Sequence, residues 1–182
     1  MAAKAEFAEH GLAGARLNRI ATTARASKER LYSYFASKEA LFEAVVAQWI
    51  HDAAPFATPL RADDVPGYVQ GLFDSFVADP QGARLQSWIE LEATEGMFAD
   101  HVLHRLVDGK LREIRRGQEA GLIDPTWHPM DLLVLLTDTA RSLAAGSSGF
   151  TLVAGVAEQS ASAQQRRYAA GVAARRLVTV LG

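Results

Sequence analysis

From residue 17 to residue 46 the chain reads LNRIATTARASKERLYSYFASKEALFEAVV. Four apolar side chains fall at i, i+3, i+4 and i+7 and predict a short helix over 17–24: Leu17, Ile20, Ala21 and Ala24. Ser27 and Ser37 are suited to cap two further helices, because a serine hydroxyl accepts a hydrogen bond from a free backbone N–H of the first turn. The stretch therefore predicts two short helices joined by a brief turn, with a longer helix after them.

Such a pair of short helices is a candidate helix-turn-helix, in which one helix enters the major groove of DNA and the other braces it. The reading helix then needs a polar outer face and a few apolar side chains that point inward. In SKERLYSYF, residues 27–35, Leu31 and Phe35 lie four positions apart and can hold the helix on its neighbours. The side chains that remain for a polyanion are Ser27, Lys28, Arg30, Tyr32, Ser33 and Tyr34.

Positive charge gathers in the same stretch. Residues 16–38 hold six basic side chains and one acidic one, whereas the whole chain of 182 residues has 19 Lys and Arg against 21 Asp and Glu, a net charge of −2. A basic patch on an acidic chain favours one local anionic partner over a generally basic coat. A solvated helical face accounts for the charge alone equally well.

The composition excludes several classes of protein. An apolar content of 49% is sufficient for a buried core and argues against disorder. The chain has no cysteine, which excludes a disulfide framework, a thiolate nucleophile and a cysteine-ligated metal site. No apolar run approaches the ~18 residues of a membrane span, and the amphipathic N-terminus MAAKAEFAEH is unlike a signal peptide. We therefore expect a cytoplasmic protein with no membrane partner.

The rest of the sequence is helical in pattern, without clean alternation of period two, so we expect an all-α fold. A first helix is expected over about 2–10, ending at Gly11. Three prolines within 53–66 indicate a connection between two parts of the chain. Further helices are expected up to about Asp79, and then over 83–95, 98–120, 129–145 and 162–181, with 146–161 left ambiguous.

Four motifs of the N-terminal part together resemble a known family. They are FAEHG at 7–11, LNRIATTA at 17–24, SKERLYSYF at 27–35 and SKEALFEAVV at 37–46, and they are similar to the DNA-binding domain of TetR-type transcriptional regulators. The resemblance implies a helix-turn-helix DNA-binding domain over 1–46, followed by a larger helical ligand-binding and dimerisation domain over 47–182. We expect no enzyme activity, no catalytic residue, no metal and no cofactor.

The resemblance also implies a mode of action. The protein is then a homodimer on a palindromic operator, since two reading helices must meet successive major grooves ~34 Å apart. A small-molecule ligand releases the DNA by favouring a dimer that no longer matches this spacing, and repression is the family's usual output. The dimer contact is expected near 129–145 and 162–181, where small residues of the second helix allow close approach.

The resemblance implies different roles for the residues that are expected to bind DNA. Tyr32, Tyr34 and Lys38 are expected to hold phosphates. Lys28, Glu29 and Arg30 are the candidates for base edges, because arginine can pair with guanine and glutamate can accept a hydrogen bond from cytosine. The full set is Arg16, Arg25, Ser27, Lys28, Glu29, Arg30, Tyr32, Tyr34 and Lys38.

Several positions depart from the family's pattern. The turn usually carries glycine and a small apolar residue, whereas this chain has Arg25 and Ala26. If Arg25 adopts a positive φ, it costs about 1 kcal/mol or more relative to glycine. Glu29 stands where a small neutral residue is usual, and Ala15 and Arg16 replace the usual threonine before the second helix. The first helix also starts abruptly, which leaves open whether the native chain extends before Met1.

Candidate ligand-binding residues of the second part are aromatic or charged: Phe73, Phe76, Trp88, Phe98, Trp127, Asp138 and Arg141. Core packing is the alternative for the aromatic residues, and a local ion pair is the alternative for Asp138 and Arg141. A metal site is a further possibility, because three potential ligands lie at i, i+4 and i+8: Asp100, His104 and Asp108. However, a single helix rarely completes the coordination shell of a metal. The alternatives to a regulator are a metal-dependent enzyme and a helical interaction protein with a degenerate reading helix.

Overall fold

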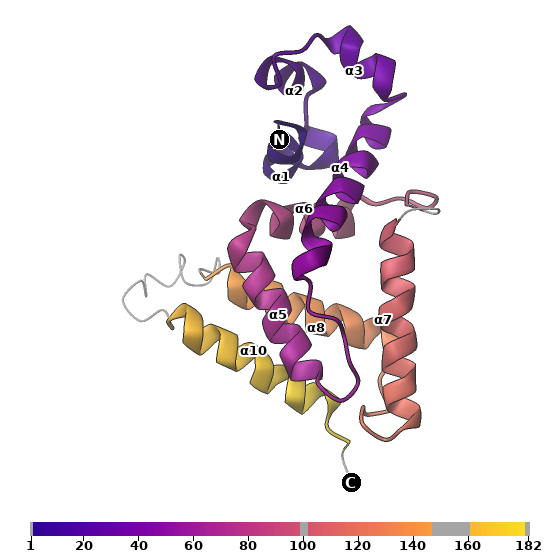
Figure 1. Ribbon diagram of the computed structural model, residues 1–182, viewed down its shortest axis with the longest axis vertical. Coiled ribbons are helices and arrows are strands. Elements are labelled where there is room, and N and C mark those ends of the chain that lie inside the picture. The colour runs from indigo at the N-terminus through magenta and orange to yellow at the C-terminus, as the bar shows by residue number, and fades with distance from the viewer. Residues whose placement is uncertain (1, 99–101, 147–160, 181–182) are drawn as a thin grey trace. The chain divides into compact units, whose positions relative to one another are not determined.

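The computed structural model describes residues 2–98, 102–146 and 161–180, and in these residues every regular element is a helix (Figure 1). This confirms the all-α prediction. The chain divides into two compact units, Met1–Pro55 with Asp79–Arg105 and Phe56–Ala78 with Leu106–Gly182. The domain boundaries expected from the sequence stay predictions, because a compact unit is no test of a functional domain.

Helices of different parts of the chain build each unit. The first unit contains α1 (Ala2–Gly14), α2 (Leu17–Thr23), α3 (Lys28–Tyr34), α4 (Lys38–Ala53) and α6 (Pro80–Glu92). A 3-10 turn, Ala54–Phe56, follows α4. The second unit contains α5 (Val65–Ala78), most of α7 (Val102–Glu119), α8 (Pro129–Ala144) and α10 (Ala163–Val178).

Aromatic rings form the centre of the first unit. Phe7 of α1 meets Phe42 of α4 edge to face, with ring centroids 5.0 Å apart, and the Phe98 ring lies 6.1 Å from Phe42. Leu85 and Ile89 of α6 are buried in the same cluster. Burying side chains of this size stabilises the unit by roughly 1.5–3 kcal/mol each. The helix α6 therefore shares one core with α1 and α4.

The start of α6 lies earlier than the pattern predicted. The helix begins at Pro80 and not near 83. Asp79 accepts a hydrogen bond from Gly82 N (3.0 Å) and so caps the first turn. Proline is suited to the first helical position, since its missing N–H has no helical partner there. This pair of residues was a local signal that the periodicity alone did not use.

The first helix contains a break at the residue where it was expected to end. Gly11 adopts φ 68° and ψ −176°, a conformation almost restricted to glycine. The regular helix is interrupted at Gly11, as expected, but the chain resumes a helical turn beyond it that reaches Gly14 and that the sequence pattern did not predict. Ala15 N donates to Gly11 O (3.2 Å), which makes Gly11 the first residue of that turn.

In the second unit α5 packs against both α8 and α10 (Figure 1). It begins at Val65, inside the connection expected over 53–66, because Asp64 accepts a hydrogen bond from Gly67 N (2.9 Å) in its first turn. A separate core lies between these helices and α7. Its buried members include Tyr68, Val69, Phe73, Phe76, Leu111, Ile114, Leu132, Leu136, Ala170 and Ala174.

The loop between α7 and α8 is fastened to the end of α10. Trp127 Nε1 donates to Leu177 O (2.9 Å), and Asp124 N donates to Val178 O (3.0 Å). The Asp124 side chain is buried, and its Oδ1 accepts from Thr126 N (2.9 Å). These contacts fix the loop although it has no regular structure.

Two other expectations concern residues that are only partly described. Asp100, raised for a metal site, lies outside the described residues, and among the described ones no three His, Asp or Glu side chains gather into such a site. The ambiguous stretch 146–161 is described only at its two ends. Within the described part of the chain, no helix has both the length and the apolar character needed to cross a membrane.

Candidate nucleic-acid interface

The helix α3 is held at its ends and exposes most of its surface. The Ser27 hydroxyl accepts a hydrogen bond from Arg30 N (3.1 Å), which confirms the predicted cap. Leu31 and Phe35 are partly buried and pack against the core of the first unit, as their spacing predicted. No residue of α3 is fully buried. Most of its surface is therefore available to a partner.

The exposed side chains of α3 include two basic and two aromatic ones. Tyr34 is 72% exposed and Tyr32 is 50% exposed. The Lys28 ammonium lies 5.8 Å from the centre of the Tyr32 ring, and both Lys28 and Arg30 are exposed. This surface combines positive charge with rigid rings that end in hydroxyl groups, which suits contacts with phosphate oxygens and base edges.

Glu29 lies in the first turn of α3 and is exposed. Hydrogen bonds from its own backbone N–H and from the Ser27 hydroxyl lower the pKa of its carboxyl. The carboxylate is stabilised at the start of α3, where the positive end of the helix dipole favours a negative charge. It also disfavours a phosphate at the same place.

The turn between α2 and α3 holds an arginine in the left-handed region. Arg25 has φ 53°, the positive value considered for this departure from the family's pattern. Ala26 N donates to Ala21 O (2.9 Å) and Arg25 N donates to Thr22 O (3.1 Å), the paired hydrogen bonds of a Schellman motif. This motif ends α2 and directs the chain into α3. The Arg25 side chain is exposed beside it.

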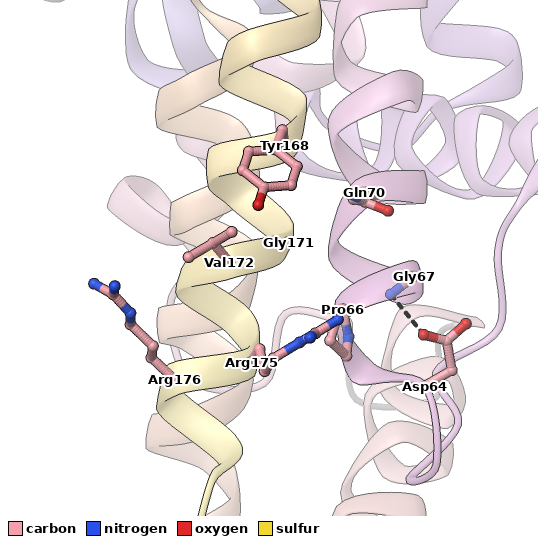
Figure 2. A pocket seen from close by; sticks show the side chains of 9 residues that line it. All are labelled: Asp64, Pro66, Gly67, Gln70, Tyr168, Gly171, Val172, Arg175 and Arg176. Atoms are coloured by element: carbon pink, nitrogen blue, oxygen red, sulfur yellow. Dashed lines mark hydrogen bonds between the residues drawn. The ribbon is translucent and has the colours of Figure 1, made fainter.

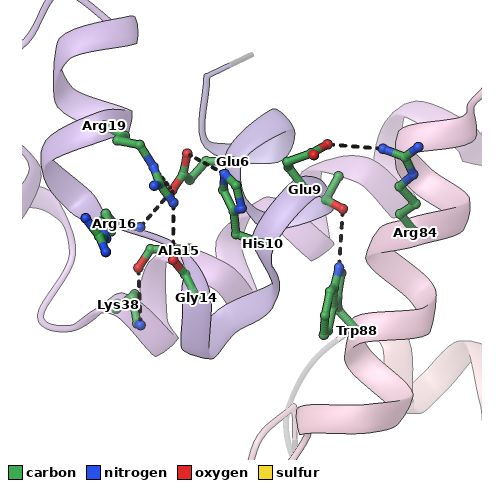
Figure 3. A network of polar contacts seen from close by, with 11 residues as sticks. Glu6, Glu9, His10, Gly14, Ala15, Arg16, Arg19, Lys38, Arg84 and Trp88 are labelled. Atoms are coloured by element: carbon green, nitrogen blue, oxygen red, sulfur yellow. Dashed lines mark hydrogen bonds and ion pairs between the residues drawn. The ribbon is translucent and has the colours of Figure 1, made fainter.

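Glu6 of α1 organises the start of α2 (Figure 3). Its Oε1 accepts hydrogen bonds from Arg16 N (2.8 Å) and from Arg19 Nε (2.7 Å). Burial raises the pKa of the Glu6 carboxyl, but the hydrogen bonds from Arg19 and Arg16 outweigh it, and the net shift is downward. The charge of Arg19 is thus paired inside the unit, while the Arg16 side chain stays exposed.

Lys38, expected at a phosphate, has contacts within the protein. Its ammonium donates to the carbonyl oxygens of Ala13 (3.1 Å) and Ala15 (3.4 Å), just before α2. Figure 3 shows Lys38 beside Ala15. The predicted cap of α4 is confirmed, since Ser37 Oγ accepts from Ala40 N (3.1 Å). An ammonium has three donors, so a third is left for another acceptor. Sequence reasoning missed the Glu6 and Lys38 contacts, because they join distant residues that no local pattern links.

Two family models match the sequence that forms these units. The model of bacterial regulatory proteins of the tetR family covers residues 1–45, and the model of the tetracyclin repressor-like C-terminal domain covers residues 64–176. The chain belongs to the TetR family. It is a DNA-binding transcriptional regulator, as its family and relatives are, and the metal-dependent or purely interacting alternatives are not favoured.

Proteins similar to this TetR-family regulator support the family assignment. It is 38% identical to the HTH-type transcriptional repressor SCO4008 of Streptomyces coelicolor over 141 residues, which are 77% of this chain and 73% of the relative. It is 40% identical to the crystal structure of SCO4942 from Streptomyces coelicolor, with a TM-score of 0.75, over 97% of this chain and 94% of the other. FadR of Bacillus subtilis, solved with stearoyl-CoA, shares the fold at 16% identity and a TM-score of 0.61, over 100% of this chain and 96% of the other.

The TetR-family chain divides its predicted ligand-binding residues between the two units. Phe73 and Phe76 of α5 are buried in the second unit. Asp138 and Arg141 of α8 form the local ion pair that was the alternative to a ligand role. Trp127 anchors the loop before α8, as described above. These residues do not converge on one described pocket.

The other two predicted ligand-binding residues belong to the first unit. Phe98 lies in the aromatic core beside Phe42. Trp88 lies on α6, and its Nε1 donates to Ala8 O (3.2 Å) of α1 (Figure 3). Both therefore contact helices of the first unit.

A groove of about 400 Å³ lies in the second unit between the start of α5 and α10 (Figure 2). None of the predicted ligand-binding residues lines it. The Arg175 side chain reaches from α10 toward Pro66, while Arg176 points away from α5. The lining residues are Asp64, Pro66, Gly67, Gln70, Tyr168, Gly171, Val172, Arg175 and Arg176. No local pattern in the sequence predicts this groove, because its two sides come from segments about a hundred positions apart.

Proposed function

We propose that this TetR-family regulator is a repressor that binds a palindromic operator as a homodimer in the cytoplasm and leaves it when a small molecule binds. The outer face of α3 carries the proposal. The helix is capped, has no fully buried residue and exposes tyrosine and basic side chains. The major groove admits one such helix with its side chains on the base edges.

The residues at this face have distinct proposed partners. Arg30 and Lys28 reach guanine edges, and Glu29 accepts a hydrogen bond from cytosine N4. Phosphate contacts fix the register of the protein on the duplex and come from residues around α3. These are Arg16, Arg25, Ser27, Tyr32, Tyr34 and the remaining donor of Lys38.

The proposed dimer forms through α8 and α10. On α8, Met130, Val134 and Leu135 are exposed apolar side chains, and Val134 is 49% exposed. Tyr168 of α10 is 69% exposed. Apolar side chains on two adjacent helices favour a contact with the same helices of a second copy, because a two-fold axis pairs identical surfaces. Such a dimer presents two α3 helices to successive major grooves ~34 Å apart.

The proposed effector acts through a difference in affinity. A ligand shifts an equilibrium only as far as it binds one state better than the other. It therefore releases DNA by favouring a dimer whose α3 helices no longer match the operator. The candidates for its binding in the second unit are Phe73, Phe76, Trp127, Asp138 and Arg141.

A selection experiment tests the DNA-binding face. The purified chain is mixed with genomic fragments, and the bound fragments are sequenced. The same selection is made with Arg30→Ala/Tyr34→Ala and with Arg112→Ala. Arg112 is an exposed cation of α7, so its loss changes charge without changing the α3 face.

We expect the wild type and Arg112→Ala to recover fragments that share one palindrome, and Arg30→Ala/Tyr34→Ala to lose that enrichment. Recovery of the same palindrome by the α3 variant would refute the proposed reading face. Enrichment of a motif without inverted symmetry would refute the proposed dimeric operator. A small molecule that releases the recovered fragment then identifies the effector.

A further inference from the structure

The helices α6 and α1 lie side by side in the first unit. They run in the same direction, because the contacts advance together along both. Polar contacts join them along their length: Lys4 with Asp79, Glu9 with Arg84 (3.2 Å), the Ala8 carbonyl with Trp88 Nε1 (3.2 Å), and the amides of Leu12 and Ala13 with Glu92. Figure 3 shows the contacts of Arg84 and Trp88.

The contact with Glu92 caps the turn that follows the break in α1. Amides at the start of a helical turn have no acceptor within that turn. Glu92 supplies one from α6, since its Oε2 accepts from Leu12 N and its Oε1 accepts from Ala13 N (3.3 Å). A carboxylate at this end also complements the dipole of the turn. A side chain some 80 positions away thus performs the task of a local cap.

Trp88 secures the break itself. A Cβ at Gly11 would lie 2.7 Å from Trp88 Cε3, so the indole packs directly on the glycine backbone. Its Nε1 also satisfies the carbonyl of Ala8, which precedes the break. Trp88 and Glu92 are four residues apart on α6 and so share one face of that helix. One face of α6 therefore contacts the chain both before the break, at Ala8, and after it, at Leu12.

The turn capped by Glu92 leads directly into the helix-turn-helix. The carbonyls of Ala13 and Ala15 hold the Lys38 ammonium at the start of α4. The backbone N–H of Arg16 donates a hydrogen bond to Glu6 of α1, and α2 begins at the next residue, Leu17. Since α3 follows α2 and precedes α4, the path of this turn fixes where α3 lies within the unit.

We propose that Glu92 and Trp88 are positioning residues for sequence-specific DNA binding. They lie outside residues 1–45, which match the family's DNA-binding model. They act through the turn after Gly11 and have no DNA contact of their own. Without the Glu92 carboxylate, the chain from Leu12 to Arg16 takes other paths, and α3 is correctly placed in fewer molecules. Base readout suffers more than phosphate contact, because only base edges carry sequence information.

The test compares Glu92→Ala and Glu92→Gln with the control Glu95→Ala, all in the full chain. Glu95 is an exposed residue beyond the end of α6, and its loss changes the charge equally. Two DNA probes are used. One is a duplex that the wild type recovers from a random-sequence library, and the other is a duplex of equal length with a scrambled sequence. Deuterium exchange of the backbone amides and urea unfolding are measured on the same samples.

We expect Glu92→Ala to weaken binding to the recovered duplex on the order of tenfold. The ratio of its affinities for the two duplexes falls, and exchange accelerates at Leu12 and Ala13. Glu92→Gln keeps an acceptor oxygen and restores part of the ratio. Charge alone predicts the reverse, because removing an acidic residue strengthens DNA binding, as expected for Glu95→Ala.

An unchanged affinity ratio for Glu92→Ala overturns the proposal. The proposal is also overturned if the affinity falls by the same factor for both duplexes and that factor equals the loss of folded protein. If Glu92→Ala does not fold, Trp88→Phe is tested in its place, because it keeps an aromatic ring on this face of α6 but removes the donor to Ala8 and part of the indole that packs on Gly11. We expect it to lower the same ratio by a smaller factor, and an unchanged ratio counts against the proposal.

Discussion

At the scale of single residues, the turn before α3 contains a backbone conformation that lowers stability, and the proposed function explains why it is kept. Arg25 adopts φ 53°, where glycine is the residue with no steric penalty. We propose that the exposed cation of Arg25 compensates for this cost by reaching a phosphate. A substitution at this position is therefore expected to change the stability and the DNA affinity in opposite directions.

We predict that Arg25→Gly raises the free energy of unfolding by about 1 kcal/mol and weakens binding to all DNA sequences. Urea denaturation and binding at several salt concentrations measure the two effects. Arg30→Gly is the matched comparison, because the same change inside α3 lowers stability by roughly 0.5–1 kcal/mol. A loss of stability in Arg25→Gly would contradict the account of this turn.

Glu113 gives the second unit a dependence on acid. The hydrogen bond from Arg116 and the one from Ala62 N (2.8 Å) lower the pKa of its carboxyl to about 2. The ordinary value is 4.5, so the folded state binds the proton less well than the unfolded chain. The stabilisation is then complete above pH 4.5 and is lost as the pH falls toward 2.

We predict that Glu113→Gln is less stable than the wild type at pH 7 and loses less stability than the wild type between pH 4.5 and 2. Urea unfolding over this range measures the slope. Glu119→Gln, a change of the same kind at the exposed end of α7, keeps the slope of the wild type. Parallel curves for Glu113→Gln and the wild type would show that this carboxyl does not cause the acid dependence.

At the scale of the elements, α2, α3 and α4 could be predicted because their signals are local. Ser27 and Ser37 cap the helices that follow them, and Leu31 and Phe35 hold α3, all within a few residues in sequence. The same signals predicted that the outer face of α3 is polar. Local spacing is sufficient wherever a helix carries its own cap and its own apolar stripe.

The coupling of α1 and α6 could not be predicted in the same way. Its contacts join residues 75 to 80 positions apart, and no spacing in the sequence links Glu92 with Leu12. The break at Gly11 depends on those contacts, so a pattern that ends the helix there missed the turn beyond it. The contact of Trp88 with Ala8 could not be predicted for the same reason, since the two residues are 80 positions apart.

The helix α3 makes a prediction that separates base readout from phosphate contact. We expect Arg30→Ala to relax base preference at one position of each half-site, with a cost of about 1–3 kcal/mol on the preferred sequence. Tyr34→Phe, which removes only a hydroxyl, weakens all sequences alike. Selection from a random library followed by sequencing measures both. Equal losses on every sequence for Arg30→Ala would contradict its place at a base edge.

At the scale of the whole molecule, the proposed function depends on a second copy of the chain. We predict that Val134→Glu prevents the dimer, because it buries a charge at the proposed α8 contact. Light scattering then gives the mass of one chain. Val77→Glu is the control, since Val77 is 44% exposed on α5 and lies outside α8 and α10. A dimer that persists in Val134→Glu would exclude this face.

We propose that two α3 helices, one from each chain of a dimer, read one operator. Hydroxyl-radical footprinting of the wild type on a recovered genomic fragment tests it most directly. We expect two protected patches related by inverted sequence, with centres ~34 Å apart along the duplex, and loss of both patches in Arg30→Ala/Tyr34→Ala. A single patch, or protection that survives in that variant, would contradict it.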